Sequence, residues 1–94
     1  MADDYKPDDF RDSVGETFEV DANGEKIGLE LDDFQDLPPG IREQGCFRLR
    51  FRGPTDPLLP QGLYRLERGG EGYDIFIVPV AQGQQGTTYE AIFN

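Results

Sequence analysis

Three arginines alternate with large apolar residues in the segment Cys46–Gly53, which has the sequence CFRLRFRG. In a β-strand successive side chains point to opposite faces, so Arg48, Arg50 and Arg52 would share one face at a spacing of about 6.5–7 Å. Guanidinium groups bind carboxylates and other anions through paired hydrogen bonds. The row therefore predicts either ion pairs with acids on neighbouring strands, which we favour, or a site for an anion or a carboxylate-rich partner. The candidate acids are Glu30, Glu67 and Glu90.

Enzyme chemistry finds little support in the residue types. The chain has no histidine, which excludes the usual Ser–His–Asp and Cys–His arrangements and histidine metal sites. Paired carboxylates remain as a general acid–base site. Acids are so common in this chain that their presence carries little information, so we predict no catalytic residues and a protein that is not an enzyme. The carboxylates concerned are Glu30, Asp32, Asp33, Asp36 and Glu90.

Metal and cofactor sites are not predicted either. Cys46 is the only cysteine, so neither an intrachain disulfide nor a multi-cysteine metal site can form. Because Cys46 opens an apolar strand, we expect a small buried residue. The oxygen-bearing segment Asp21–Glu25 lacks the rest of a twelve-residue calcium loop. The segment Gly69–Gly72 lacks the lysine and hydroxyl residue of a phosphate-binding loop.

The negative charge of the chain is unevenly distributed. The net charge is −10, and residues 1–45 carry fourteen acids against four basic residues, whereas residues 46–94 carry five of each. An acidic surface repels nucleic-acid phosphates and anionic lipids, and it favours solubility or a basic partner. The chain shows neither a signal peptide nor a run of about 20 apolar residues. We therefore predict a cytoplasmic protein that binds neither nucleic acid nor membrane.

The loop Gly53–Gly62 offers a second candidate contact surface. It contains three prolines, which restrict the backbone and make the loop rigid. Its two apolar residues, Leu58 and Leu59, must be either buried or presented to another molecule. We predict both as binding residues, together with the arginine row.

The elements that position these residues are mostly strands. At 94 residues, the chain fits a flexible leader over residues 1–6 and a single β domain over residues 7–94. Alternation of apolar residues predicts about six strands, and the segment Pro7–Gly15 predicts one short helix. The fold class is mainly β: a small antiparallel barrel or sandwich. The predicted strands cover residues 16–20, 26–31, 46–52, 63–68, 73–80 and 88–94.

Local signals refine this outline. Asn23-Gly24 predicts a tight hairpin turn. Residues 32–45, which include Pro38-Pro39-Gly40, are expected to leave the sheet after Leu31. The strand around residues 75–80 is apolar on both faces, which predicts the most buried strand. Pro79 cannot donate to a ladder, so a bulge or the end of pairing is expected there.

Four motifs stand out along the chain: Phe47-x-Leu49-x-Phe51-x-Gly53-Pro54, Pro60-Gln61-Gly62-x-Tyr64, Phe76-x-x-Pro79-Val80 and Tyr89-Glu90-Ala91-Ile92-Phe93-Asn94. Together with Phe10, Gly15 and Phe18, they resemble a family of small bacterial domains of unknown function, whose members typically end in a Tyr-Glu-Ala-x-Phe-Asn strand. The resemblance covers about residues 10–94 and brings no catalytic residues to carry over. It implies gene neighbourhoods that encode phage-tail-collar-like proteins, and so an accessory or assembly role.

Taken together, these patterns predict a non-enzymatic protein-interaction or assembly module, without cofactor, that binds an unidentified protein partner. Leu58 and Leu59 in the rigid loop, with a strand at the edge of the sheet, would make the contact. The alternative is a β-barrel that binds a small ligand or anion through Arg48, Arg50 and Arg52. A carboxylate-based enzyme is the third choice.

Overall fold

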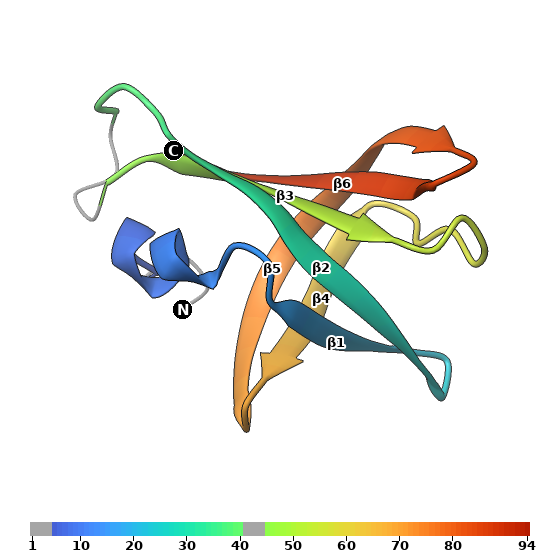
Figure 1. The fold of residues 1–94 in the computed structure, drawn as a ribbon. Helices are drawn as coiled ribbons and strands as arrows, with labels where there is room; N and C mark the ends of the chain where they lie inside the picture. The colour runs from blue at the N-terminus through green and yellow to red at the C-terminus, as the bar shows by residue number, and fades with distance from the viewer. Residues whose placement is uncertain (1–4, 41–44) are drawn as a thin grey trace.

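The computed structural model describes residues 5–40 and 45–94. In this part of the chain, six strands, each with one apolar face, close into an antiparallel barrel (Figure 1). The strand order around the barrel is β1-β2-β3-β6-β5-β4. The sequence left a barrel and a sandwich open, and the closed ring decides for the barrel. The strands are β1 (Thr17–Ala22), β2 (Glu25–Asp36), β3 (Phe47–Gly53), β4 (Gly62–Arg68), β5 (Glu71–Gly83) and β6 (Gly86–Phe93).

The predicted hairpin between β1 and β2 is confirmed. Asn23 and Gly24 form its turn with positive φ angles of 56° and 86°, the backbone geometry that an Asn-Gly pair favours. The register that follows from this turn places Ile27, Leu29 and Leu31 inside the barrel, where all three are buried as predicted.

The second strand is longer than its sequence indicates. β2 runs to Asp36, so the prediction that the chain leaves the sheet after Leu31 is wrong. β2 pairs with β3 on both sides of an irregularity between Leu31 and Asp33. A bulge of this kind accommodates an extra residue and keeps the strand in the sheet. Phe34 then stacks on Phe47 of β3 with ring centroids 5.7 Å apart, and this contact holds the extension in place.

The prediction that β5 is buried on both faces is wrong for its outer face. Ile75 and Ile77 point inward and are buried, but Phe76 and Val80 are about half exposed. The core lies inside the ring, so side chains on the outer face of a strand meet solvent. Pro79 lies at the expected irregularity, where the register between β5 and β6 shifts.

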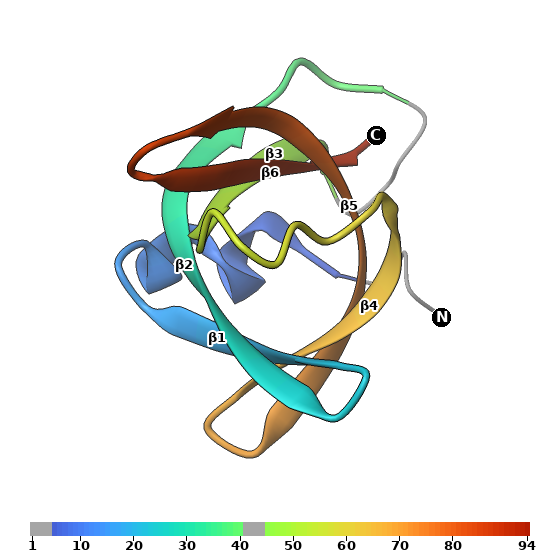
Figure 2. The same cartoon turned by 90° about the vertical axis from the view of Figure 1, so that its right-hand side faces the viewer.

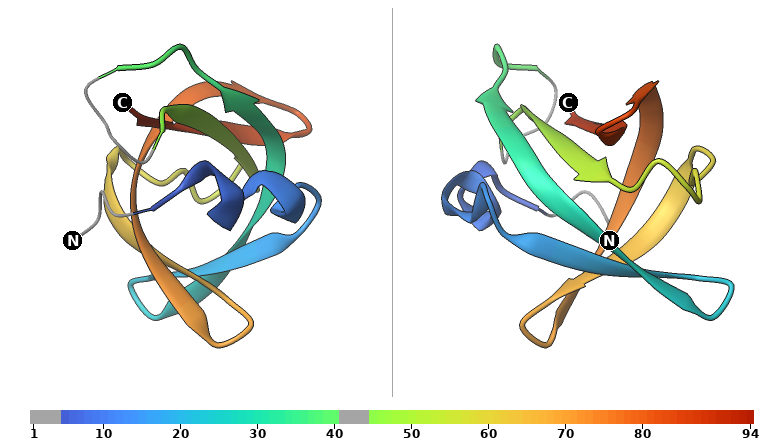
Figure 3. Two further views of the ribbon diagram at one scale, coloured as in Figure 1. Left: turned by 90° about the vertical axis from the view of Figure 1, so that its left-hand side faces the viewer. Right: turned by 45° about the vertical axis from the view of Figure 1, so that its right-hand side comes forward.

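The N-terminal segment closes one end of the barrel (Figure 3, left). The predicted short helix consists of two 3-10 turns, η2 (Pro7–Asp9) and η3 (Arg11–Ser13). Phe10, between the turns, is fully buried, whereas Val14 after the second turn is half exposed. Five other aromatic rings surround Phe10 at centroid distances of 5.3–6.4 Å, namely those of Tyr5, Phe18, Phe47, Tyr73 and Phe93. Among the described residues, no helix has the length and apolar character needed to cross a membrane.

Tyr5 also contributes to closing the barrel, because it contacts both β5 and β6. The sequence assigns it to a flexible leader whose first four residues lie outside the described part of the chain, but Tyr5 packs against the core. Its hydroxyl accepts a hydrogen bond of 2.8 Å from the Asp74 N–H, and its ring lies 6.3 Å from that of Phe93. The ladder between β5 and β6 begins at Val78, so Tyr5 connects the two strands where they are not paired.

Replacing Phe10 with alanine should lower the free energy of unfolding by about 3–5 kcal/mol, because the change leaves a cavity among the packed rings. Urea unfolding followed by circular dichroism measures this loss. The control is Phe76→Ala, which truncates a half-exposed ring and should cost less than about 1 kcal/mol. Equal losses in the two variants would contradict the central role of Phe10.

Candidate functional site

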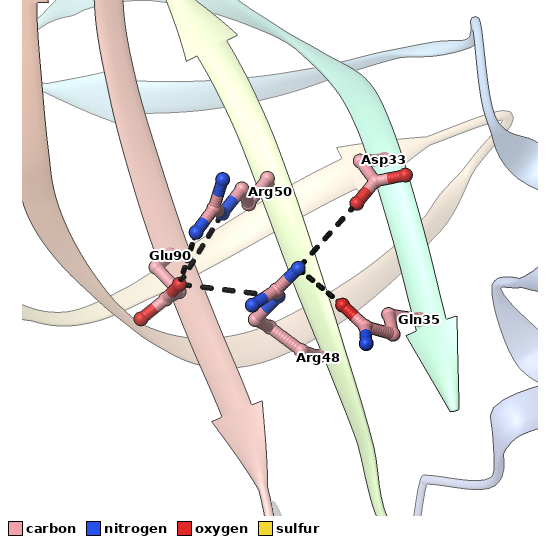
Figure 4. Close-up of polar contacts among 5 residues, drawn as sticks. All are labelled: Asp33, Gln35, Arg48, Arg50 and Glu90. Atoms are coloured by element: carbon pink, nitrogen blue, oxygen red, sulfur yellow. Dashed lines mark hydrogen bonds and ion pairs between the residues drawn. The ribbon is translucent and has the colours of Figure 1, made fainter. Parts of the chain in front are cut away.

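The arginine row lies on the outer face of β3 and is paired with acids on both neighbouring strands (Figure 4). Arg50 is opposite Glu90 of β6, and its Nε and Nη2 donate to Glu90 Oε2 at 3.3 and 3.2 Å. Arg48 Nε lies 3.9 Å from the same oxygen. On its other side, Arg48 Nη2 donates to Gln35 and lies 3.7 Å from Asp33 Oδ2. Glu90 is therefore shared by two arginines.

The third arginine pairs with β2, since Arg52 Nη2 lies 3.2 Å from Asp32 Oδ1. The favoured prediction of cross-strand ion pairs is thus confirmed, but only Glu90 among the three expected acids is a partner of the row. Glu67 instead lies 3.9 Å from Arg65, and Arg52 pairs with Asp32 although Glu30 is its Cα partner. The bulge in β2 explains the exchange of Glu30 for Asp32, because it keeps the acids after Leu31 beside β3. Glu67 lies on β4, which is not adjacent to β3.

The row is a partly buried network. The side chains of Arg48 and Glu90 are only 24% and 20% exposed, and Arg50 is 42% exposed. Among the described residues, the buried Nε of Arg48 has no hydrogen-bond acceptor beyond the longer contact to Glu90. An incoming anion would have to compete with carboxylates that are already in place. These ion pairs therefore act mainly to hold β2, β3 and β6 together.

Four of the five acids considered for carboxylate catalysis form ion pairs with arginines. Asp36 Oδ1 lies 2.8 Å from Arg11 Nη2, while Asp32 and Asp33 pair with arginines of β3. Within residues 5–40 and 45–94, no three acidic, cysteine or histidine side chains gather in a position to hold a metal ion. Cys46 is buried, as expected for a small core residue. The structure therefore does not bring these acids together into one site.

The loop before β4 crosses one end of the barrel (Figure 2). It buries one of the two leucines that were predicted as contact residues and exposes the other. Leu59 is 3% exposed and belongs to the core, and its N–H donates to the Tyr89 hydroxyl at 2.9 Å. The loop closes the second end of the barrel with this side chain, which is therefore buried in the core and not presented at the surface. Leu58 is 44% exposed and lines a groove of about 400 Å³.

Sequence reasoning missed an apolar surface on the outer face of β4, β5 and β6. Leu63 is 62% exposed, Phe76 directly opposite it is 52% exposed, and Ile92 is 52% exposed. The ladder between β5 and β6 begins with Val78 opposite Glu90. Phe76 lies two residues before Val78 and Ile92 two residues after Glu90, so both side chains face outward on adjacent strands. We call Leu63, Phe76 and Ile92 the outer apolar patch. In the sequence, this surface corresponds to the two-sided apolar character of residues 75–80, which predicts burial instead.

The barrel matches a protein family along nearly its whole length. A comparison with family models aligns residues 5–93 with a domain of unknown function, DUF6916. The chain belongs to the DUF6916 family. The aligned region extends from the Tyr5 contact to the end of β6, so the family domain and the barrel coincide. Searches of curated proteins and of solved structures found no match.

Neutralising the shared carboxylate should weaken the barrel more than removing one arginine. Glu90→Gln is expected to lower the free energy of unfolding by about 1–2 kcal/mol, because it leaves two arginines side by side. Arg50→Gln should cost less than about 1 kcal/mol, since Arg50 is partly exposed. Urea unfolding measures both. The control, Arg65→Gln, removes an exposed pair with Asp74; a loss for Glu90→Gln no larger than the control's would contradict this role of Glu90.

Proposed function

We propose that this DUF6916 domain is a non-enzymatic protein-interaction or assembly module that contacts its partner through the outer apolar patch. The supporting observation is the exposure of Leu63, Phe76 and Ile92 on the outer faces of three adjacent strands. Exposed apolar side chains that gather in one place mark contact surfaces, whereas scattered ones do not. A large aromatic side chain such as Phe76 is a typical anchor at the centre of an interface.

Charged residues next to the patch support this assignment. Arg65 and Asp74 are the neighbouring outward pair on β4 and β5, with Nη1 and Oδ1 3.2 Å apart. Arg48 is opposite Ile92 on the other side. An apolar centre with a polar rim is the usual composition of a protein interface. Because these charges are already paired within the chain, the apolar centre would supply most of the binding energy.

The other functions have less support. An anion-binding barrel would use the arginine row, but each of its arginines lies 3.2–3.9 Å from a carboxylate. A carboxylate-based enzyme would need a free pair of carboxylates, whereas Asp32, Asp33, Asp36 and Glu90 are each paired with an arginine. A bacterial source and gene neighbours that encode phage-tail-collar-like proteins, which the sequence resemblance implies, fit an assembly role. We place this module in the cytoplasm.

The substitution Phe76→Asp tests the proposal, because it puts a charge at the centre of the patch. Purified from its native cells, the wild-type chain should carry one stoichiometric partner, and the variant should lose it. The thermal midpoint should stay within about 4 °C of the wild type, since Phe76 is half exposed.

The matched control is Val14→Asp, which changes a similarly exposed apolar residue at the η3 end and should keep the partner. Retention of the partner by Phe76→Asp would contradict the assigned surface. Sulfate titration checks the anion-binding alternative. A midpoint that rises with sulfate in the wild type but not in Arg50→Gln would favour that alternative.

A further inference from the structure

A groove lies where β1 and β4 separate, on a different surface from the outer apolar patch. In the described structure, the ladder between these strands has two pairs and ends at Val20 opposite Leu66, although β1 continues to Ala22 and β4 begins at Gly62. The β1–β2 turn and the loop before β4 both lie at the right-hand end of the barrel in Figure 1. The groove between them has a volume of about 400 Å³, which suits a few side chains of a ligand.

One wall of this groove is apolar and rigid. Leu58 is partly exposed and lies between Pro57 and Pro60, which restrict the loop backbone. Tyr64 donates its hydroxyl hydrogen to the Pro60 carbonyl at 2.7 Å. Burial, and to a lesser extent Tyr89, raises the pKa of Tyr64, so the hydroxyl remains a neutral donor near pH 7. Because the prolines and the Tyr64 hydrogen bond already restrict this wall, little conformational entropy is lost when an apolar side chain binds to it.

The other wall is acidic. Asp21 and Glu25 are the charged residues among those that line the groove, and neither forms an ion pair within the described part of the chain. Asp21 Oδ1 accepts a hydrogen bond of 2.9 Å from the Gly24 N–H, which leaves its second carboxylate oxygen for a ligand. Lys26 is the cross-strand partner of Asp21, and together with Arg65 it lines an adjoining hollow that Asp21 also borders, whereas Glu25 lines only the groove. The groove therefore attracts cations, and the surrounding acidic half of the chain strengthens this attraction.

We propose that the groove binds a short extended segment of a partner protein in which an apolar side chain lies beside an arginine or lysine. The apolar side chain rests on Leu58, and the cationic group faces Asp21 and Glu25. Charge complementarity selects a basic protein segment over nucleic acid or anionic lipid. The part of β1 beyond Val20 has no β4 partner in the described ladder, so an extended backbone can lie along this edge.

A seven-residue random peptide library displayed on phage tests this inference on the full chain. Selection on the wild type, with counter-selection on Glu25→Lys, should enrich peptides that carry arginine or lysine next to a large apolar residue. The most enriched peptide is then synthesised and titrated by fluorescence anisotropy. Glu25→Lys and Leu58→Asp should each weaken its binding about tenfold or more, because each removes one half of the recognition. Added salt should also weaken binding.

Matched controls separate this site from general charge effects. Asp12→Lys and Val14→Asp make the same charge changes at the η3 end of the barrel and should leave peptide affinity unchanged. Thermal midpoints show whether each variant is folded. Because Glu25 is exposed, we expect Glu25→Lys to fold, so it tests the groove even if Leu58→Asp does not fold. The inference is overturned if no peptide is enriched, if enriched peptides lack a basic residue, or if neither groove variant weakens binding. It is also overturned if spermine alone competes as well as the peptide.

Because these variants lie outside the outer apolar patch, the peptide experiment and the Phe76→Asp experiment give separate results. Loss of the native partner from Phe76→Asp with no peptide selected would leave the proposed function standing and remove the groove. The reverse result would keep the groove and move the partner contact away from the patch.

Discussion

Filling the two ends of the barrel is the constraint on which the rest of this structure depends. Strands that close into a ring leave an interior that must be occupied by side chains. The inward residues of the strands fill its middle, but the ends are filled by residues from outside the sheet: Phe10 at one end and Leu59 at the other. The same two segments lie near the places where the ladders are incomplete, between β5 and β6 and between β1 and β4.

This arrangement ties the candidate binding surfaces to the closure of the fold. Leu59 enters the core, and the adjacent Leu58 is turned outward beside the groove. The rigid loop therefore stabilises the barrel with one leucine and exposes the other leucine to solvent. On the other side, Phe76 is exposed because its neighbours Ile75 and Ile77 are buried. A surface supported directly by the core in this way is well ordered, which lowers the entropy lost when a partner binds.

Charge is unevenly distributed along the sequence, and ion pairs join its two halves. The second half of the sequence is neutral, but its arginines pair both with Glu90 of the same half and with Asp32 and Asp33 of the first half. The excess of negative charge lies in the first half, where the wall of the groove formed by Asp21 and Glu25 is found. A basic partner would meet the acidic half first, whereas an apolar contact is better placed on the neutral half.

The sequence by itself determined the inner face of the strands, the Asn23-Gly24 turn and the irregularity at Pro79, because each is a local or strictly periodic signal. It also indicated that acids would pair with the arginine row, but of the three acids it offered only Glu90 is a partner of the row. The tertiary structure decided that the ring closes, that β2 continues through a bulge and that Phe76 faces solvent. It also decided that Leu58 is exposed while Leu59 is buried. Periodicity tells which side of a strand is apolar, but it does not tell whether a second layer covers that side. In a loop there is no period at all, so only the packing of the barrel end separates one leucine from the next.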